Sequence, residues 1–126
     1  MDPRVWGPHA WFFIETVVLS MPDDITDTSP YRAFLQSLKD VLPCPGCRQE
    51  YSEYLTTHPV PTSRKDIIEW VFTLHNTVRQ RTGKQPRSTQ SMMDYYASQY
   101  SQKSSYTMWI LCALLIIGAI VYTLKK

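Results

Sequence analysis

A run of residues without a charge, from Tyr106 to Leu124, limits the possible folds of this chain more than any other stretch. At about 1.5 Å per residue, a helix of this length crosses a hydrocarbon layer of about 30 Å. Aromatic residues lie near both ends, and the basic tail of residues 125–126 follows. The run predicts a transmembrane helix over 106–124, with a buried core helix as the alternative. The folded domain is then expected over residues 1–101, with a linker over 102–105.

The first residues do not have the pattern of a signal peptide, because Glu15 interrupts the apolar stretch from Phe12 to Leu19. An apolar segment at the C-terminal end inserts into a membrane only after synthesis. We therefore expect a single-pass, tail-anchored protein whose domain faces the cytosol.

Composition narrows the class of function. The 126 residues allow one domain, and a net charge of +2 does not suggest a surface for nucleic acid, so no such partner is expected. Three cysteines cannot all pair, so a framework of disulfides is not expected either. The cysteines are better interpreted as reactive groups.

The spacing of apolar residues predicts an all-α domain, since no stretch shows the sustained alternation of a strand. Apolar residues recur every three or four positions in three segments, which are Trp11 to Met21, Tyr31 to Leu42 and Ile67 to Val78. We place Pro8 in the first turn of the first helix, where its missing N–H does no harm. A third helix is expected to run from the CPGC segment to the break at HPVP.

Helix ends are marked as well. Ser63 and Asp66 form an approximate capping box for the fourth helix, and Gly83 fits the position just after its end. A shorter, more polar fifth helix is expected from about Thr89 to Tyr100, before a flexible linker.

The strongest candidate for a reactive site is the segment Pro43, Cys44, Pro45, Gly46 and Cys47. Two cysteines three positions apart can close a disulfide, and the N–H groups at a helix N-terminus favour a thiolate. Arg48 adds a positive charge nearby.

Three alternatives compete with a redox role. Zinc would need two more ligands, for which only His58 and His75 are at hand, at a spacing unlike that of a compact finger. A thioredoxin-like site would follow a strand, whereas this segment follows a helical stripe. Two unconnected buried thiols are the third alternative. No metal site is predicted.

Two further clusters accompany the cysteines. His75, Asn76 and Arg79 project from neighbouring positions of the fourth helix, and a basic pair beyond them could hold an aromatic heterocycle with a phosphate tail. A core histidine with solvated arginines is the alternative. Trp11 and Glu15 share one face of the first helix, where core packing is the usual explanation.

Taken together, WGPHAW, CPGCR and WVFTLHNTVRQRTGK, in this order, resemble the Erv/ALR family of FAD-dependent sulfhydryl oxidases, in particular small members from large DNA viruses. The resemblance covers about residues 6 to 84. It implies a four-helix bundle with a short fifth helix, usually a homodimer, that holds FAD and makes disulfides with O2 as acceptor, giving H2O2.

The resemblance also implies roles for residues. Cys47 corresponds to the thiol beside the flavin, and Cys44 to the sulfur that exchanges with the substrate. The positions expected to bind FAD are Gly7, Trp11, Glu15, Tyr51, His75, Asn76, Val78, Arg79, Arg81 and Lys84.

Some positions depart from the family pattern. Pro8 replaces a basic residue, Glu15 a histidine, Arg79 an asparagine, and Phe72 a cysteine of cellular relatives. A separate shuttle disulfide is missing, so a thiol-containing substrate or a thioredoxin-like shuttle protein is expected to bring electrons to Cys44. Cys112 is interpreted as a packing residue.

The resulting hypothesis is a tail-anchored viral oxidase in the host cytoplasm, the virus factory or the virion membrane. A zinc-binding adaptor and a virion membrane protein with a vestigial oxidase fold are the rival hypotheses.

Overall fold

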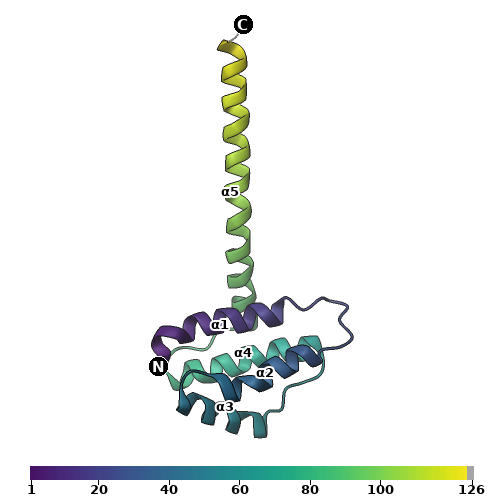
Figure 1. The fold of residues 1–126 in the computed structure, drawn as a ribbon, viewed down its shortest axis with the longest axis vertical. Helices are drawn as coiled ribbons and strands as arrows, with labels where there is room; N and C mark the ends of the chain where they lie inside the picture. The colour runs from purple at the N-terminus through teal and green to yellow at the C-terminus, as the bar shows by residue number, and fades with distance from the viewer. Residues whose placement is uncertain (125–126) are drawn as a thin grey trace. The chain divides into compact units, whose positions relative to one another are not determined.

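The structure, a computed structural model, describes residues 1–124, except for the side chains of residues 102–108, 118, 119, 121 and 124. Every regular element in this part of the chain is a helix (Figure 1). The predicted all-α class is therefore confirmed. The helices are α1 (Pro3–Leu19), α2 (Ser29–Val41), α3 (Pro45–Thr57), α4 (Arg64–Arg81) and α5 (Thr89–Leu124).

The chain forms two compact units, residues 1–87 and 88–126, and the boundary falls inside the predicted domain of residues 1–101. The first unit holds α1 to α4. In it α1 packs on α4, and α2 packs on α3 (Figure 1). Arg64 Nε, at the start of α4, donates to the carbonyl of Met21, just after the end of α1, at 2.9 Å. The helices α1 and α4 are therefore antiparallel.

The helix α1 begins earlier than its sequence suggested. Asp2 is its N-cap, because the carboxylate accepts from the N–H of Arg4 at 2.8 Å, and Pro3 occupies the first turn. The prediction that Pro8 lies in the first turn is wrong, since Pro8 lies inside the helix. The helix begins earlier than predicted because Asp2, a good capping residue, is followed directly by Pro3, which suits the first turn.

The helix α4 begins and ends where its sequence predicted. The Ser63 hydroxyl accepts from the N–H of Asp66 at 3.1 Å. At the other end Gly83 has φ 75°, and two hydrogen bonds close the motif, from Gly83 N to Gln80 O and from Lys84 N to Arg79 O. This is a Schellman arrangement, in which a residue of positive φ satisfies the last carbonyls of a helix.

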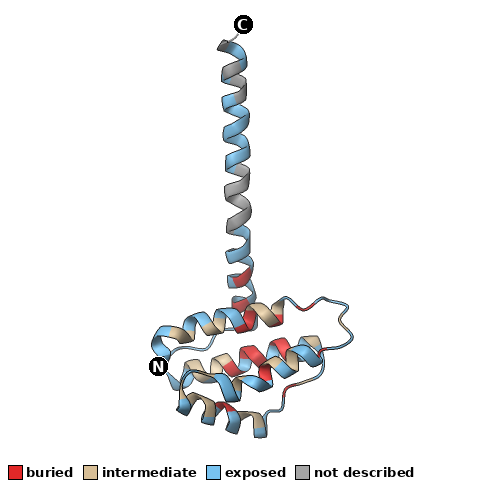
Figure 2. Ribbon diagram, in the orientation of Figure 1, coloured by how far each residue is buried: buried red, intermediate tan, exposed pale blue. Residues whose placement is uncertain are grey.

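The core of the first unit lies largely between α1 and α4, where buried residues gather (Figure 2). Three of the four residues predicted for the α1 stripe are buried, while Trp11 is half-buried. Of the α4 stripe Val78 is half-buried, and the others are buried. Fully covered side chains include Val18, Leu35, Ile67, Val71 and Phe72.

The helix α5 differs from the prediction of a short fifth helix. It is continuous over 36 residues and passes through 102–105, where a flexible linker was expected. That segment contains no glycine or proline, the residues that end helices most strongly. Within the described residues, no helix is both long and apolar enough to cross a membrane. The transmembrane helix predicted over 106–124 is therefore not supported. The side chains of part of this run, and residues 125–126, are not among those that the structure describes.

Candidate functional site

The two cysteines of the CPGC segment lie at the N-terminus of α3. Cys44 is the N-cap, and its Sγ accepts a hydrogen bond from the N–H of Cys47 at 3.3 Å. Pro45 occupies the first turn, where no N–H is needed. Both sulfurs are partly exposed and are present as free thiols. The local sequence thus places one thiol directly on the free N–H groups of a helix end.

The environment separates the acidities of the two thiols. Hydrogen bonds from the side chain and the N–H of Cys47 lower the pKa of Cys44. Burial raises the pKa of Cys47 to about 11, and the hydrogen bond and negative charge of Cys44 and the Glu50 carboxylate contribute in the same direction. In the reduced pair, Cys44 is therefore the thiol that ionises first.

Arg48 does not take the role expected from its position. Its Nη1 donates to the carbonyl of Leu42 at 2.6 Å, so the guanidinium satisfies the backbone after α2. The causes of the lowered Cys44 pKa are hydrogen bonds within the CPGC segment. The prediction that Arg48 favours an anionic sulfur therefore finds no support in this geometry.

An ion pair joins the cysteine helix to the end of α4. Glu50 lies one turn after Cys47, and its carboxylate contacts Arg81 Nη2 at 2.7 Å, with both side chains about half exposed. The CPGC segment therefore lies at the same end of the unit as the basic end of α4. Sequence reasoning did not single out Glu50, although its spacing of three from Cys47 on a helix places it near that thiol.

A second cluster joins α1 to α4. The rings of Trp11 and His75 stack with centroids 4.2 Å apart and planes inclined by 4°. His75 Nδ1 lies 2.6 Å from Glu15 Oε1, and the side chains of His75 and Glu15 are 15% and 4% exposed. The structure therefore brings together three residues that the sequence assigned to the cofactor, of which two are 60 positions apart.

Two other predicted cofactor residues hold the loop after α4. The Asn76 amide donates from Nδ2 to the carbonyl of Arg87 at 2.7 Å and accepts from the N–H of Arg87 at 2.9 Å. Arg79 Nε donates to the carbonyl of Gln85 at 2.9 Å. These polar groups therefore already have backbone partners in the chain itself.

The remaining predicted site residues are more scattered. Tyr51 is buried, its hydroxyl donates to Leu35 O at 2.7 Å, and burial raises its pKa. Gly7 faces open space, since a Cβ built there meets no atom within 4 Å. Lys84 is exposed. A different residue, Trp6, carries a buried ring Nε1 that has no hydrogen-bond partner.

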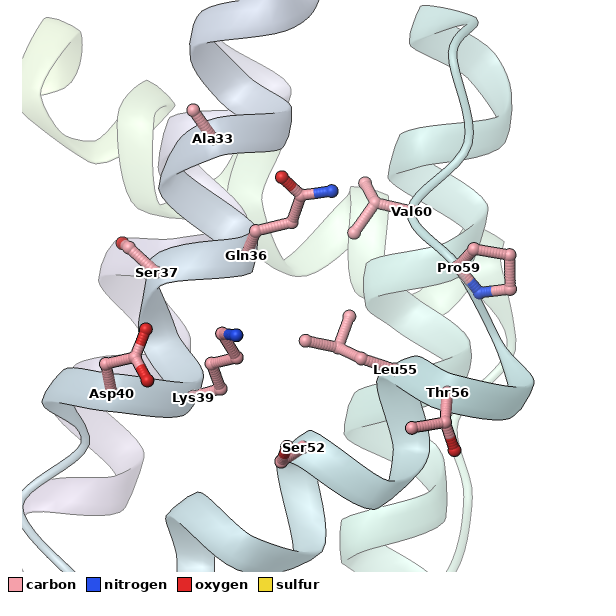
Figure 3. Close-up of a pocket in the computed structure, with 10 residues that line it drawn as sticks. All are labelled: Ala33, Gln36, Ser37, Lys39, Asp40, Ser52, Leu55, Thr56, Pro59 and Val60. Carbon is pink, nitrogen blue, oxygen red and sulfur yellow. The ribbon is translucent and has the colours of Figure 1, made fainter.

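A pocket of about 530 Å³ lies elsewhere, between α2 and α3 and the loop that follows α3 (Figure 3). Gln36, Leu55 and Val60 are among its lining residues, which include neither cysteine nor any predicted cofactor residue. Among the described residues, no three histidine, cysteine, aspartate or glutamate side chains are grouped to hold a metal ion.

The sequence profile of the Erv1 / Alr family matches residues 8–100 of the chain. A protein of Acanthamoeba polyphaga mimivirus, named a probable FAD-linked sulfhydryl oxidase, is 37% identical over 90 residues, which cover 67% of this chain and 63% of that protein. The mitochondrial FAD-linked sulfhydryl oxidase erv1 of Schizosaccharomyces pombe is 26% identical over 88 residues, covering 66% of this chain and 48% of that protein. The matched part is thus less than two thirds of the length of either relative.

Solved structures support the same fold. The FAD binding domain of Erv1 from Saccharomyces cerevisiae superposes with a TM-score of 0.66 at 24% identity, covering 71% of this chain and 89% of that one. A cysteine-to-serine mutant of the same yeast protein gives a TM-score of 0.66 at 22% identity, covering 71% and 79%.

Proposed function

Because the chain belongs to the Erv1 / Alr family, we propose that it is an FAD-linked sulfhydryl oxidase that forms disulfide bonds in partner proteins. The observation that carries the proposal is the pair of cysteines at the N-terminus of α3, in which one thiol is more acidic than the other. In the overall reaction two thiols and O2 give one disulfide and H2O2.

Cys44 is the sulfur that exchanges with the substrate. With the pair oxidised, a substrate thiolate attacks Cys44 Sγ, the bond between the two cysteines breaks, and Cys47 leaves with the electron pair. A second substrate thiolate then attacks the mixed disulfide and releases Cys44, whose lowered pKa makes it a good leaving group. The substrate then carries the new disulfide, and the cysteine pair, now reduced, has gained two electrons.

Cys47 is the sulfur on the cofactor side. Burial is the largest cause of its raised pKa, whereas hydrogen bonds from Cys47 are the largest causes of the lowered pKa of Cys44. Because the pKa of Cys47 is raised, its thiolate forms readily only beside a group that stabilises the negative charge. FAD, when bound, would supply an electron-poor ring system beside Cys47 and the capacity to accept two electrons and pass them on to O2.

The residues around α1 and α4 fit such a cofactor. The stacked pair Trp11 and His75 offers aromatic surface to a planar ring, and the Trp6 Nε1 donor lacks a partner. Basic side chains at the end of α4 suit a diphosphate. The residues proposed to hold FAD are Gly7, Trp11, Tyr51, His75, Asn76, Val78, Arg79, Arg81 and Lys84, with Glu15 behind them.

The test uses the full-length chain and its visible flavin absorption. We expect a yellow protein whose band bleaches with dithiothreitol under anaerobic conditions and returns in air. Cys47→Ser is expected to retain FAD and to lose thiol-dependent oxygen consumption, whereas Cys112→Ser, the matched control on α5, keeps it. A colourless protein that retains zinc would contradict the proposal and favour the adaptor, and bound FAD without thiol oxidation would favour the vestigial fold.

A second protein is proposed to bring electrons to Cys44, either a thiol-containing substrate or a thioredoxin-like shuttle. Within this sequence the remaining cysteine is Cys112, on α5, which provides no second pair. A mixed disulfide trapped by Cys47→Ser and identified by mass spectrometry would name the partner. Capture at Cys112 instead would contradict the assignment of Cys44.

A homodimer is also proposed, through apolar side chains on α1 and α2. Phe13 packs edge-on against Phe34 at 6.0 Å and remains 59% exposed, while Val5 and Val41 are 72% and 65% exposed. Light scattering is expected to give the mass of two chains, and Phe13→Asp to give one. A monomeric unmodified chain would contradict this proposal.

Membrane attachment through residues 106–124 is a further proposal, which rests on the sequence alone. The run has no charge. Expression with and without this run, followed by carbonate extraction of membranes, tests it. Release of the full-length chain by carbonate would contradict an anchor. A protease-protection assay would show whether the first unit faces the cytosol.

A further inference from the structure

Glu15 is a buried carboxylate whose position calls for an explanation. The residue is 3% exposed, on the face of α1 that packs on α4. An ionised carboxylate in such a place is strongly destabilised unless charged or polar groups compensate it. His75 is one such group, with its Nδ1 2.6 Å from Glu15 Oε1.

The contact with Glu15 bears on which ring nitrogen of His75 carries a hydrogen and which nitrogen is left for a ligand. When the Glu15 carboxylate is ionised it only accepts hydrogen bonds, and Nδ1 of His75 is then the donor in this contact. The opposite nitrogen, Nε2, is then the one left for another partner. A carboxylate behind a histidine commonly sets which nitrogen meets a ligand.

The contact also fixes the orientation of the ring. Trp11 covers one face of His75 at 4.2 Å with planes inclined by 4°, while Glu15 holds its Nδ1 edge. Trp11 and Glu15 are four residues apart on α1, so one helix supplies both restraints. Together they limit tilt and in-plane rotation of the imidazole.

Stability alone does not account for this arrangement. A leucine at a buried position of this kind packs without desolvating a charge, and replacing buried ion pairs with apolar residues is often neutral or stabilising. Direct contact of Glu15 with a ligand is also disfavoured, because its side chain is 4% exposed and the carboxylate is engaged with His75.

We propose that Glu15 is a positioning residue, which holds His75 against Trp11 so that the two rings and Nε2 form a preset site for a planar heterocycle of FAD. The inference rests on the proposed function and deepens it. Glu15 acts through His75 and does not itself touch the cofactor.

The experiment measures the FAD dissociation constant of the full-length chain and its Glu15 variants by equilibrium dialysis. Glu15→Leu removes the hydrogen bond, and we expect affinity to fall by about tenfold to a hundredfold, the range for a hydrogen bond to a charged group. Glu15→Gln keeps an acceptor for Nδ1–H and should stay within about threefold of the unmodified chain. The control, Glu69→Gln, changes an exposed carboxylate on α4 and should leave affinity unchanged.

A second background tests whether Glu15 acts through His75. In His75→Phe, which keeps a flat ring but has no Nδ1, replacing Glu15 by Leu should weaken FAD binding by no more than about twofold. An equal loss in both backgrounds would overturn the proposal, because Glu15 would then act without His75.

A measurement without FAD separates this inference from the proposed function. In the unmodified chain the Nδ1 proton of His75 should appear in imidazole NMR spectra as a hydrogen-bonded signal, and it should be lost in Glu15→Leu. If Glu15→Leu loses its helical circular dichroism, and so does not fold, the Glu15→Gln variant is used instead. Loss of FAD binding by Glu15→Gln while its His75 Nδ1 signal is intact would overturn the proposal. If the unmodified chain binds no FAD, the proposed function is refuted. If the unmodified chain and a folded Glu15→Leu variant bind FAD equally well, only the inference about Glu15 is refuted.

Discussion

The separation of the two thiol acidities predicts that, in the reduced chain at pH 7, alkylation selects Cys44 over Cys47. With a pKa of about 11, the Cys47 thiolate fraction at pH 7 is about 10⁻⁴, against about 3% for an ordinary cysteine. A more basic thiolate is intrinsically more reactive, by about tenfold for this difference if alkylation follows the trend of thiol–disulfide exchange. Cys47 should therefore react about 30-fold more slowly than an ordinary thiol, and Cys44 should be faster than that reference.

The assay is a time course with iodoacetamide under anaerobic conditions, using a Cys112→Ser chain so that only the pair reacts. Both cysteines lie in one tryptic peptide, residues 40–48, so fragment ions in the mass spectrometer assign each modification. The rate at Cys47 should rise about tenfold per pH unit and level off near pH 11. Equal rates at pH 7, or a faster Cys47, would refute the argument.

Three predictions concern stability, each measured by urea unfolding of the full-length chain. Gly83→Ala should destabilise the first unit by about 1–2 kcal/mol, because φ 75° is unfavourable for a residue with a Cβ although space is open there; an equal effect of Gly83→Asn would count against this explanation. Ser63→Ala should cost about 1 kcal/mol through loss of the hydrogen bond to the N–H of Asp66, whereas Ser63→Asp should restore it. Phe72→Ala should cost about 3–5 kcal/mol, since the ring is 2% exposed; a loss below about 1 kcal/mol would show that the core closes around the gap.

Local features of the fold could be predicted because their causes are local. The limits of α4 follow from a serine that caps a helix and a glycine that tolerates positive φ. The start of α3 follows from the proline after Cys44. The start of α1 was misplaced, because two prolines compete for the first turn and only Pro3 follows a capping aspartate.

For the candidate site, the sequence led to a proposed set of residues, but it did not determine which of them lie in contact with one another. The sequence placed the CPGC segment at a helix N-terminus, which favours a thiolate, but the lowered pKa of Cys44 in particular comes from hydrogen bonds of the Cys47 side chain and N–H. The contact of Glu15 with His75 spans 60 positions and depends on how α1 lies on α4, which spacing within one helix does not determine. Arg48 was expected to favour an anionic sulfur, yet its Nη1 donates to the carbonyl of Leu42, a contact that forms only in the folded chain.

The clamp formed by Asn76 has a consequence for which substitutions the chain can accept. Both of its hydrogen bonds go to the N–H and carbonyl of residue 87, as a neighbouring strand would make them. Such a contact does not depend on which side chain residue 87 carries. The loop can therefore change sequence while its path is kept, and the substitution to which this clamp is most sensitive is Arg87→Pro, because proline has no N–H to donate.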